Sequence, residues 1–552
     1  MTVAEMLVKC LETEGVTRIF GVPGEENQDF LFAVDASEKI EFIPTRHEQG
    51  AAFIANVIGR LTGKAGVCLA TLGPGATNLL TGIADANSDK SPVIALTGQG
   101  SLERLHHESH QAIDVVRMFE PVTKWNTSII DPEITAEVVR KAFKLAEAEK
   151  PGVCHIELPE NIAALEVPSV CTPMQPRLVM RPAPESSAVE KAAQLLLKAE
   201  KPLVIAGNGA IRNRSSKVLT EFAEKLNLPV VHTFEGKGAV SDRSEQSLFA
   251  IGLGFKDYVA EAIEEADLII TIGYDIAEYS PDAWNSSSDK DIIHIDFAPA
   301  EVYHTYNPLV EAVGDIALSV KALQEATTGK SRCENWFADI RNRIADDIKG
   351  YDLKAGEDFN VPGILNEIRK VMSDDGLLIS DVGAHKMWIA RNFKTYEPNG
   401  CIISNGLASM GISLPGGIGA SIVNPDREIV SFMGDGGFMM NVQELETAKR
   451  LGVGYTIIVT VDDNYGLITW KQERHTGDST GTKLGNPDFV KLAEAFGIPG
   501  YRPKNLKDLR SILQKTIPSK ELCLIAIPIS TKVNDELTKK LKEYYEKAEG
   551  EE

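Results

Sequence analysis

EIVSFMGDGGF (residues 428–438) and YTIIVTVDDNYG (residues 455–466) are the two runs of sequence that decide the fold. Each begins with an apolar, β-branched stretch of the kind that forms a buried parallel strand. Between them, Val442, Leu445 and later apolar residues recur at helical spacing over 441–451. The two strands of such a strand-helix-strand unit run parallel, so Asp435 and Asp462 are expected at the same carboxyl edge of one sheet.

The glycines beside Asp435 indicate what this edge holds. Gly434, Gly436 and Gly437 let the backbone turn sharply and approach a ligand closely. Two carboxylates at the same edge suit Mg²⁺, which binds a few protein oxygens together with those of a phosphate. Seen alone, Gly-Asp-Gly is also typical of an ordinary loop. The whole block favours a site for a diphosphate and a divalent metal.

The length and strand pattern predict an α/β protein of three doubly wound, parallel-sheet domains. At 552 residues the chain is too long for a single core. Apolar strands alternate with helical stretches in an N-terminal domain (1–172), a central domain (188–330) and a C-terminal domain (361–535). A proline-rich linker follows the first domain, and residues 536–552 are expected to be a charged, solvated tail.

Composition excludes several classes of partner. A formal net charge of −22 argues against nucleic acid and anionic membranes. No apolar run reaches the ~18 residues of a membrane span, and no secretory leader is recognisable. The seven cysteines are scattered without metal-ligand or redox spacing, as expected for reduced thiols. We therefore expect a cytoplasmic protein.

Strand ends in the N-terminal domain carry a second group of unusual residues. Val22-Pro23-Gly24 ends one predicted strand, and Gly73-Pro74-Gly75 forms a rigid turn after another. Glu48 begins a predicted helix whose other first-turn residues are mostly apolar. An acidic residue is favoured at any helix N-terminus, so this position alone does not decide a role.

Together these motifs resemble the thiamine diphosphate-dependent decarboxylase and carboligase family. The block from GDG to DDNYG is similar to its cofactor signature, and RHEQGAAFIA and GPGATN are similar to the pyrimidine-binding domain of its acetolactate synthase group. The likeness is closest to the catabolic, FAD-independent branch. One departure is Asp462, where the family usually has Asn.

The resemblance implies a role for particular residues. The metal ligands are Asp435, Asp462 and the main-chain oxygen of Asn464. Glu48 shares a proton with the aminopyrimidine, and Met410 holds the cofactor bent while the Ala408 carbonyl orients its amino group. The full cofactor-binding set is Pro23, Gly24, Pro74, Asn78, Val382, Gly383, His385, Ala408, Met410, Gly434, Asp435, Gly436, Gly437, Tyr465, Gly466 and Leu467. The substrate would lie near Val22, Gln111 and Lys471.

Three other patterns are weaker. Gly207-Asn208-Gly209 is a fragment of a dinucleotide motif without its third glycine, and we expect an ordinary turn there. The segment 272–285 resembles the flavin-free branch, so FAD is not expected. His106, His107 and His110 are expected in a solvated or substrate-facing loop, because no second cluster of metal ligands follows them.

The resemblance implies a thiamine diphosphate- and Mg²⁺-dependent carboligase that joins two pyruvate molecules to give 2-acetolactate. The family's sites lie between subunits, so a homodimer or homotetramer is expected. Glu25 would repel an anionic 2-oxo acid if it faced the pocket, and it departs from the family pattern, as does Lys471. Two alternatives therefore stay open: a related 2-oxo acid decarboxylase or aldehyde carboligase, similar to benzaldehyde lyase, and a family member without catalysis.

Overall fold

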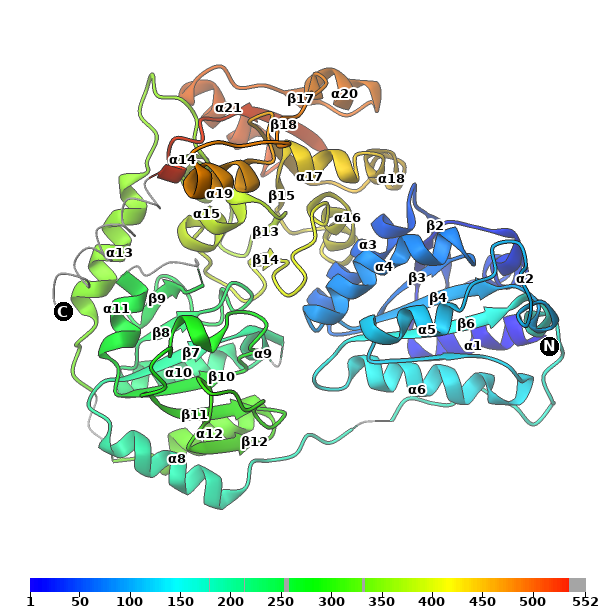
Figure 1. Cartoon of the computed structure of the whole chain (residues 1–552), viewed down its shortest axis with the longest axis horizontal. Coiled ribbons are helices and arrows are strands. Elements are labelled where there is room, and N and C mark those ends of the chain that lie inside the picture. Colours follow the sequence, from blue (N-terminus) through cyan, green and yellow to red (C-terminus); the bar gives the residue numbers. More distant parts are fainter. Residues whose placement is uncertain (178, 213, 253–257, 330–332, 536–552) are drawn as a thin grey trace.

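The computed structural model describes residues 1–177, 179–212, 214–252, 258–329 and 333–535. It contains three six-stranded sheets, and their strands pair in parallel. Helices follow the strands along the chain and cover the sheets (Figure 1). The predicted α/β class with three parallel-sheet domains is confirmed. The predicted charged tail, 536–552, lies outside the described residues.

The N-terminal sheet has the strand order β2-β1-β3-β4-β6-β5. Its strands are β1 (Arg18–Gly21), β2 (Glu41–Pro44), β3 (Gly66–Ala70), β4 (Val93–Gln99), β5 (Trp125–Ser128) and β6 (Val153–Pro159). Its helices are α1 (Val3–Glu14), α2 (Gln28–Asp35), α3 (Glu48–Thr62), α4 (Pro74–Ser88), α5 (Val115–Phe119), α6 (Thr135–Glu147) and α7 (Glu160–Ala163). The sequence does not predict β5, because this edge strand is half-buried and mostly polar.

The C-terminal sheet repeats this plan in the order β14-β13-β15-β16-β18-β17. Its strands are β13 (Leu377–Ser380), β14 (Cys401–Ile403), β15 (Ile429–Gly434), β16 (Thr456–Val461), β17 (Gly500–Tyr501) and β18 (Cys523–Pro528). Its helices are α14 (Val361–Val371), α15 (Ala384–Asn392), α16 (Ser413–Val423), α17 (Asp435–Met440), α18 (Glu444–Leu451), α19 (Gly466–Thr476), α20 (Phe489–Ala495) and α21 (Leu506–Thr516).

The predicted start of the helix over 441–451 is wrong. The chain enters α17 directly at Asp435, and α18 begins only at Glu444. Asn441 ends α17, and its side chain donates a hydrogen bond to the carbonyl of Gly411 at 2.8 Å. The Gly-rich segment is therefore the first turn of a helix, with Asp435 in that turn.

The central sheet has the order β9-β8-β7-β10-β11-β12, which is the strand order of dinucleotide-binding domains. Its strands are β7 (Pro202–Ala206), β8 (Val230–His232), β9 (Ser247–Ala250), β10 (Leu268–Ile272), β11 (Asp291–Asp296) and β12 (Val310–Val313). Its helices are α8 (Ser186–Lys198), α9 (Asn208–Arg212), α10 (Ser216–Leu226), α11 (Tyr258–Glu265) and α12 (Ile316–Ala326), and α13 (Ala338–Gly350) leads to the next domain. The turn expected at Gly207–Gly209 is instead the start of α9.

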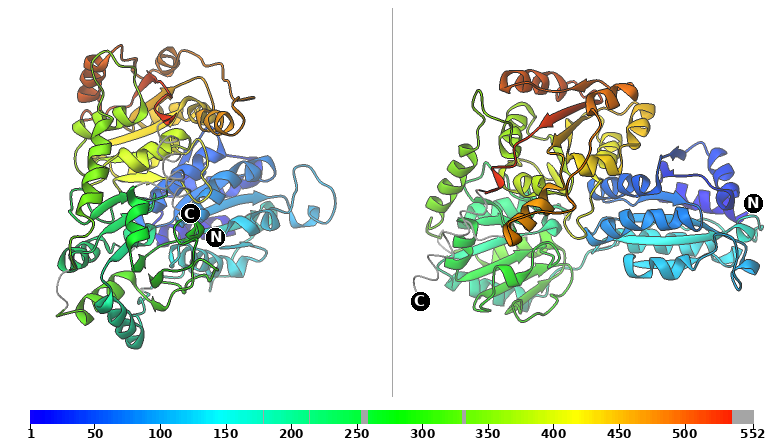
Figure 2. Two further views of the ribbon diagram at one scale, coloured as in Figure 1. Left: turned by 60° about the vertical axis from the view of Figure 1, so that its left-hand side comes forward. Right: turned by 45° about the horizontal axis from the view of Figure 1, so that its top comes forward.

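The N-terminal domain meets both other domains (Figures 1 and 2). Helix α3 packs on α16, and Val57 and Ile418 belong to one buried cluster that spans the N- and C-terminal domains. A Cβ atom on Gly419 would lie 2.7 Å from the carbonyl oxygen of Ile54, so this close approach of the helices needs glycine. The start of α3 is thereby fixed relative to the C-terminal sheet.

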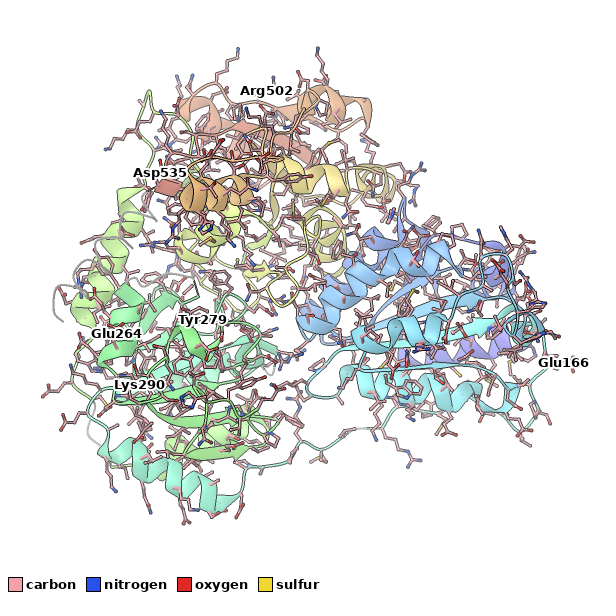
Figure 3. The ribbon with its side chains drawn as sticks, viewed as in Figure 1. Glu166, Glu264, Tyr279, Lys290, Arg502 and Asp535 are labelled. Carbon is pink, nitrogen blue, oxygen red and sulfur yellow. The ribbon has the colours of Figure 1, made fainter. Side chains whose placement is uncertain are left out.

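A long connection leads from the N-terminal to the central domain. Figure 3 shows Glu166 at the outer edge of the N-terminal domain, where it pairs with Thr2 in a single antiparallel bridge. The described residues of 167–185 contain no helix or strand, as the proline-rich sequence predicts. In the described part of the chain, no helix combines the length and the apolarity needed to cross a bilayer.

Candidate active site

Asp435 and Asp462 lie together at the carboxyl ends of the adjacent strands β15 and β16, as predicted. Oδ2 of Asp435 accepts hydrogen bonds from the backbone amides of Asp462 at 3.2 Å and Asp463 at 2.8 Å. It also accepts one from the side chain of Asn486 at 2.8 Å. The Asn464 amide donates to Oδ1 of Asp462 at 3.2 Å. These bonds hold both carboxylates in fixed directions.

The electrostatics of this pair favour a bound cation. Burial raises the pKa of Asp435, and burial together with the charge of Asp435 raises the pKa of Asp462 to about 6. Two neighbouring carboxylates in a low-dielectric site repel each other unless a positive charge lies between them. Among the described residues, no group of three or more His, Cys, Asp or Glu side chains is arranged to hold a metal. Two carboxylates plus a main-chain oxygen suit Mg²⁺, which keeps water or phosphate oxygens as its other ligands.

These carboxylates line a pocket with about 900 Å³ of empty space, part of it open to solvent. Every predicted site residue of the C-terminal domain except Lys471 lines it. These residues are Val382, Gly383, His385, Ala408, Met410, Gly434, Asp435, Gly436, Gly437, Asp462, Asn464, Tyr465, Gly466 and Leu467. Lys471 is exposed further along α19.

The pocket has the features that a diphosphate requires. Nε2 of His385 is buried in the pocket wall and has no hydrogen-bond partner in the described structure. Burial lowers the pKa of His385 to about 4, so the ring is neutral at pH 7 and can present one N–H to an anion. A Cβ atom on Gly437 would lie 2.6 Å from Oδ1 of Asp381, so only glycine fits at this position of the pocket wall. The residues present therefore fit thiamine diphosphate with Mg²⁺.

Several pocket residues are not predicted from the sequence. Trp388 on α15 donates from Nε1 to Oδ1 of Asn534 at 2.7 Å, and both residues line the pocket. The chain that follows β18 closes this wall with Ile529, Ser530, Thr531 and Val533. The apolar run of β18 is the signal that could have located this segment, since the carboxyl ends of β18 and β16 lie side by side. Asn486 carries no comparable signal in the sequence.

The predicted residues of the N-terminal domain gather at a different place, the carboxyl ends of β1, β2 and β3. Glu48 is the first residue of α3 and is 7% exposed. Its Oε2 accepts a hydrogen bond from Nδ2 of Asn78 at 3.0 Å. A Cβ atom on Gly75 would lie 3.3 Å from Oε1 of Glu48, which leaves little space between that carboxyl and the Gly-Pro-Gly turn.

The other predicted residues of this domain lie around the same turn. Gln111 has a positive φ of 57° and touches the turn, because a Cβ on Gly73 would lie 2.7 Å from its carbonyl oxygen. Gly24 packs against Thr71 at the end of β3. Pro23 and Pro74 are exposed, and Val22 is half-buried. The pocket of the C-terminal domain includes none of these residues among those that line it.

Comparison with known proteins now identifies the family. The model described as "Thiamine pyrophosphate enzyme, N-terminal TPP binding domain" matches residues 1–118, the central-domain model matches 189–323, and the C-terminal TPP-binding model matches 381–527. The chain is 34% identical over 542 residues to an acetolactate synthase of Bacillus subtilis (strain 168), covering 95% of this chain and 93% of that protein. The chain belongs to the thiamine pyrophosphate-dependent acetolactate synthase family.

Further members of the acetolactate synthase family match over similar lengths. A catabolic acetolactate synthase of Raoultella terrigena is 35% identical over 537 residues, which cover 96% of this chain and 95% of that protein. A probable acetolactate synthase large subunit of Methanocaldococcus jannaschii is 34% identical, covering 95% of this chain and 91% of that protein. The predicted membership of the acetolactate synthase family is confirmed.

Proposed function

We propose that this protein is an acetolactate synthase, which converts two pyruvate ions and one proton into 2-acetolactate and CO₂. The observation that carries the proposal is the pocket at the ends of β15 and β16, where Asp435, Asp462 and His385 meet. Relatives named acetolactate synthase match nearly the whole chain, which supports the same reaction here.

Residues of the C-terminal domain would hold the cofactor and its metal. Asp435, Asp462 and the main-chain oxygen of Asn464 would bind Mg²⁺, and His385 would donate to the diphosphate. When bound, thiamine diphosphate supplies a carbanion that adds to the substrate carbonyl and a cationic ring that accepts the electrons left by CO₂. Ala408, Met410 and Leu467 line the pocket wall, where the first two would orient the rings and Leu467 would pack on them.

Glu48 would hold the proton that activates the cofactor. Asn78 donates to Oε2 of the buried carboxyl, so Oε1 would remain to share a proton with the bound aminopyrimidine, shielded from water. Gln111 and Val22 flank the same strand ends and would meet the substrate. Glu25 is exposed in this chain. Glu25 would repel an anionic substrate only if the second subunit forms a substrate site against this part of the N-terminal domain.

The separation of Glu48 from the pocket supports a site completed by a second copy of the chain. We infer that Glu48, Pro23, Gly24, Pro74 and Asn78 of one subunit face the pocket of its partner in a homodimer or a larger homo-oligomer. Mixing two inactive variants tests this arrangement. Co-refolded Glu48→Gln and Asp435→Asn chains would regain about a quarter of wild-type activity, because half of the random dimers hold one intact site. No recovery would place each site within one chain.

The central domain has the strand order of a dinucleotide-binding domain, but the chain makes its own contacts at the ends of β7 and β10. The amide of Gly209 donates to the carbonyl of Gly273 at 2.9 Å, so the start of α9 touches the loop after β10. The Glu278 carboxylate accepts from the amide of Asn208 at 3.0 Å, where a pyrophosphate would otherwise lie. Both contacts support the proposal that FAD does not bind. A flavin absorbance band in the purified protein would contradict it.

Product analysis with pyruvate alone tests the proposed reaction. With added thiamine diphosphate and Mg²⁺, 2-acetolactate is expected, and one CO₂ is released for every two pyruvate molecules consumed. Acetaldehyde as the main product would instead support a decarboxylase, and a product formed only with an added aldehyde would support an aldehyde carboligase. Absence of cofactor binding by calorimetry would support a member without catalysis. Turnover of a panel of 2-oxo acids then shows which of them the enzyme decarboxylates as its donor substrate.

A further inference from the structure

The loop from Ser404 to Gly411 brings two of the pocket residues into place. Ala408 and Met410 line the pocket, whereas Leu407 is exposed. Ala408 has a φ of +59°, a left-handed conformation that is uncommon for a residue with a side chain. Such a conformation persists only where the surroundings enforce it. The contacts around this loop therefore decide the shape of the pocket wall.

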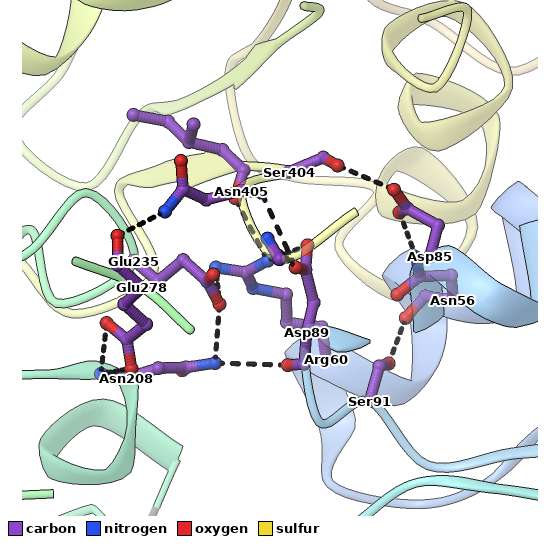
Figure 4. Close-up of polar contacts among 12 residues, drawn as sticks. Asn56, Arg60, Asp85, Asp89, Ser91, Asn208, Glu235, Glu278, Ser404 and Asn405 are labelled. Atoms are coloured by element: carbon purple, nitrogen blue, oxygen red, sulfur yellow. Dashed lines mark hydrogen bonds and ion pairs between the residues drawn. The ribbon is translucent and has the colours of Figure 1, made fainter. Parts of the chain in front are cut away.

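Several of these contacts come from the end of α4 in the N-terminal domain (Figure 4). Asp85 is fully buried, and its Oδ1 accepts hydrogen bonds from Oγ of Ser404 at 2.6 Å and from the amide of Ser409 at 3.3 Å. Its Oδ2 accepts from Nδ2 of Asn56 at 3.0 Å. Asp85 thus fixes both ends of the turn that contains Ala408.

Asp89, one turn further along the chain, fixes the middle of the loop. Its Oδ1 accepts from the amide of Gly406 at 2.8 Å, and its Oδ2 faces Arg60 at 3.3 Å. A Cβ atom on Gly406 would lie 2.8 Å from Cβ of Ser88, so the loop lies directly against the end of α4. The Asn405 side chain donates to the carbonyl of Glu278 at 2.6 Å in the central domain. The loop is therefore held from all three domains.

We propose that Asp85 is a positioning residue: through Ser404 and Ser409 its carboxylate holds the loop 404–411 in the conformation that places Ala408 and Met410 in the pocket. The catalytic consequence rests on the proposed function, whereas the structural role does not. The same helix, α4, carries Asn78, which orients Glu48. One helix therefore organises the loop of the chain's own pocket and the carboxyl that serves the partner's pocket.

Two substitutions at this position separate positioning from general stability. In Asp85→Ala both acceptors are lost. In Asp85→Asn an acceptor remains for Ser404 and Ser409, and the Asn56 amide can turn its Oδ1, which is buried without a partner, toward the new NH₂ group. We expect the alanine variant to lose loop order and the asparagine variant to restore most of it. Ser404→Ala removes two hydrogen bonds, the one that Oγ of Ser404 donates to Asp85 and the one that it accepts from the amide of Ser409. This variant serves where Asp85→Ala does not fold.

The matched control is Asp242→Ala. Asp242 is also buried, and it also joins two domains, because it accepts a hydrogen bond from the amide of Thr395 at 2.8 Å. Its partner segment lies outside the loop 404–411, so its removal should leave the loop ordered. Thermal unfolding of all four variants shows how much of each effect is general destabilisation.

The first readout is amide hydrogen exchange of the cofactor-free protein, followed in peptides that cover 404–411. Exchange of this loop should be about ten-fold faster in Asp85→Ala than in the wild type or in Asp85→Asn, because the amide of Ser409 and the hydroxyl of Ser404 lose their buried acceptor. The second readout is the concentration of thiamine diphosphate at half-saturation, which should rise about ten-fold in the alanine variant.

Unchanged loop exchange in both Asp85→Ala and Ser404→Ala would overturn the proposal. Equal acceleration in Asp242→Ala would also overturn it, since Asp85 would then act only on stability. If exchange of the loop is faster in Asp85→Ala but the wild-type protein makes no acetolactate, the positioning role of Asp85 stands and the proposed function is wrong.

Discussion

The Glu444 carboxylate of the C-terminal domain accepts a hydrogen bond from the backbone amide of His47 at 3.0 Å, one residue before Glu48. The amide of Arg46 donates to the same carboxylate at 3.2 Å, and Oγ1 of Thr447 donates at 2.6 Å. Glu444 is fully buried, and burial raises its pKa. The start of α3, and with it Glu48, is therefore anchored to the helix that follows the Asp435 turn.

Glu444→Ala should cost stability and activity together. The backbone amides of Arg46 and His47 and the hydroxyl of Thr447 would lose their shared acceptor, so we expect the free energy of unfolding to fall by about 3 kcal/mol. Turnover should fall as well, because Glu48 is no longer held in place. Urea unfolding and steady-state turnover measure the two effects. Glu446→Ala, a half-buried neighbour paired with Arg450, is the control and should change stability by less than about 1 kcal/mol.

Glu48→Gln should remove turnover while leaving the fold intact. The amide cannot exchange a proton with the cofactor, so we expect a fall of at least about 100-fold in kcat. Its oxygen still accepts from Asn78, and the melting temperature should therefore stay the same. Acetolactate formation and circular dichroism measure the two quantities, with the exposed Glu137→Gln as control. Retention of wild-type turnover would rule out the proposed role of Glu48.

The sequence predicts the pocket well because its residues lie at strand ends. Asp435 and Asp462 follow apolar runs, and the parallel geometry of those strands brings their carboxylates to one edge without knowledge of the rest of the fold. The glycines beside Asp435 indicate that the backbone approaches a ligand closely there. Val382, Gly383 and His385, which line the same pocket, were predicted from the resemblance to the family and not from such local signals.

Contacts between domains are not predicted, because nothing local reports them. Asp85 lies inside a helix and meets Ser404, which is 319 positions away in the chain. In sequence it reads as an ordinary helical aspartate. Helix α18 illustrates another limit: helical spacing alone placed its start at Asn441, whereas the bond from Asn441 to Gly411 breaks the helix there. Tertiary hydrogen bonds decide both cases.

Removal of the metal should abolish activity, and the two aspartates should differ in their response to substitution. Asp435 accepts bonds from the amides of Gly436, Asp462 and Asp463, so an amide in its place would face these donors. Asp435→Asn should therefore lose activity at any Mg²⁺ concentration. Asp462→Asn keeps an oxygen ligand, and we expect near-normal turnover with about ten-fold more Mg²⁺ at half-saturation.

Chelation followed by Mg²⁺ titration measures both responses, with the exposed Asp478→Asn as control. Full activity of the chelated wild-type enzyme would contradict the metal site. Equal responses of the two asparagine variants would contradict the different roles assigned to Asp435 and Asp462.

The stability of the protein should depend on pH through Asp85. Burial, together with the charge of Asp89, raises the pKa of Asp85 to about 7, and bonds from Ser404 and Ser409 oppose that shift. The charge of Lys386 interacts with those of Asp85 and Asp89. The folded state therefore holds a proton on Asp85 between pH ~4 and 7, where the unfolded chain has released it. The contribution of Asp85 to stability is full below pH ~4 and declines as pH rises to 7.

Asp85→Asn removes this titration but keeps the neutral form of the side chain. The free energy of unfolding of the wild type, minus that of the variant, should fall between pH 5 and 7 by about 1.4 kcal/mol for each pH unit at most. Urea unfolding at pH 5, 6, 7 and 8 measures this difference, and Asp29→Asn at an exposed position should follow the wild type. Parallel curves for Asp85→Asn and the wild type would show that Asp85 is ionised throughout this range. The loop 404–411 would then be held by a full charge on Asp85.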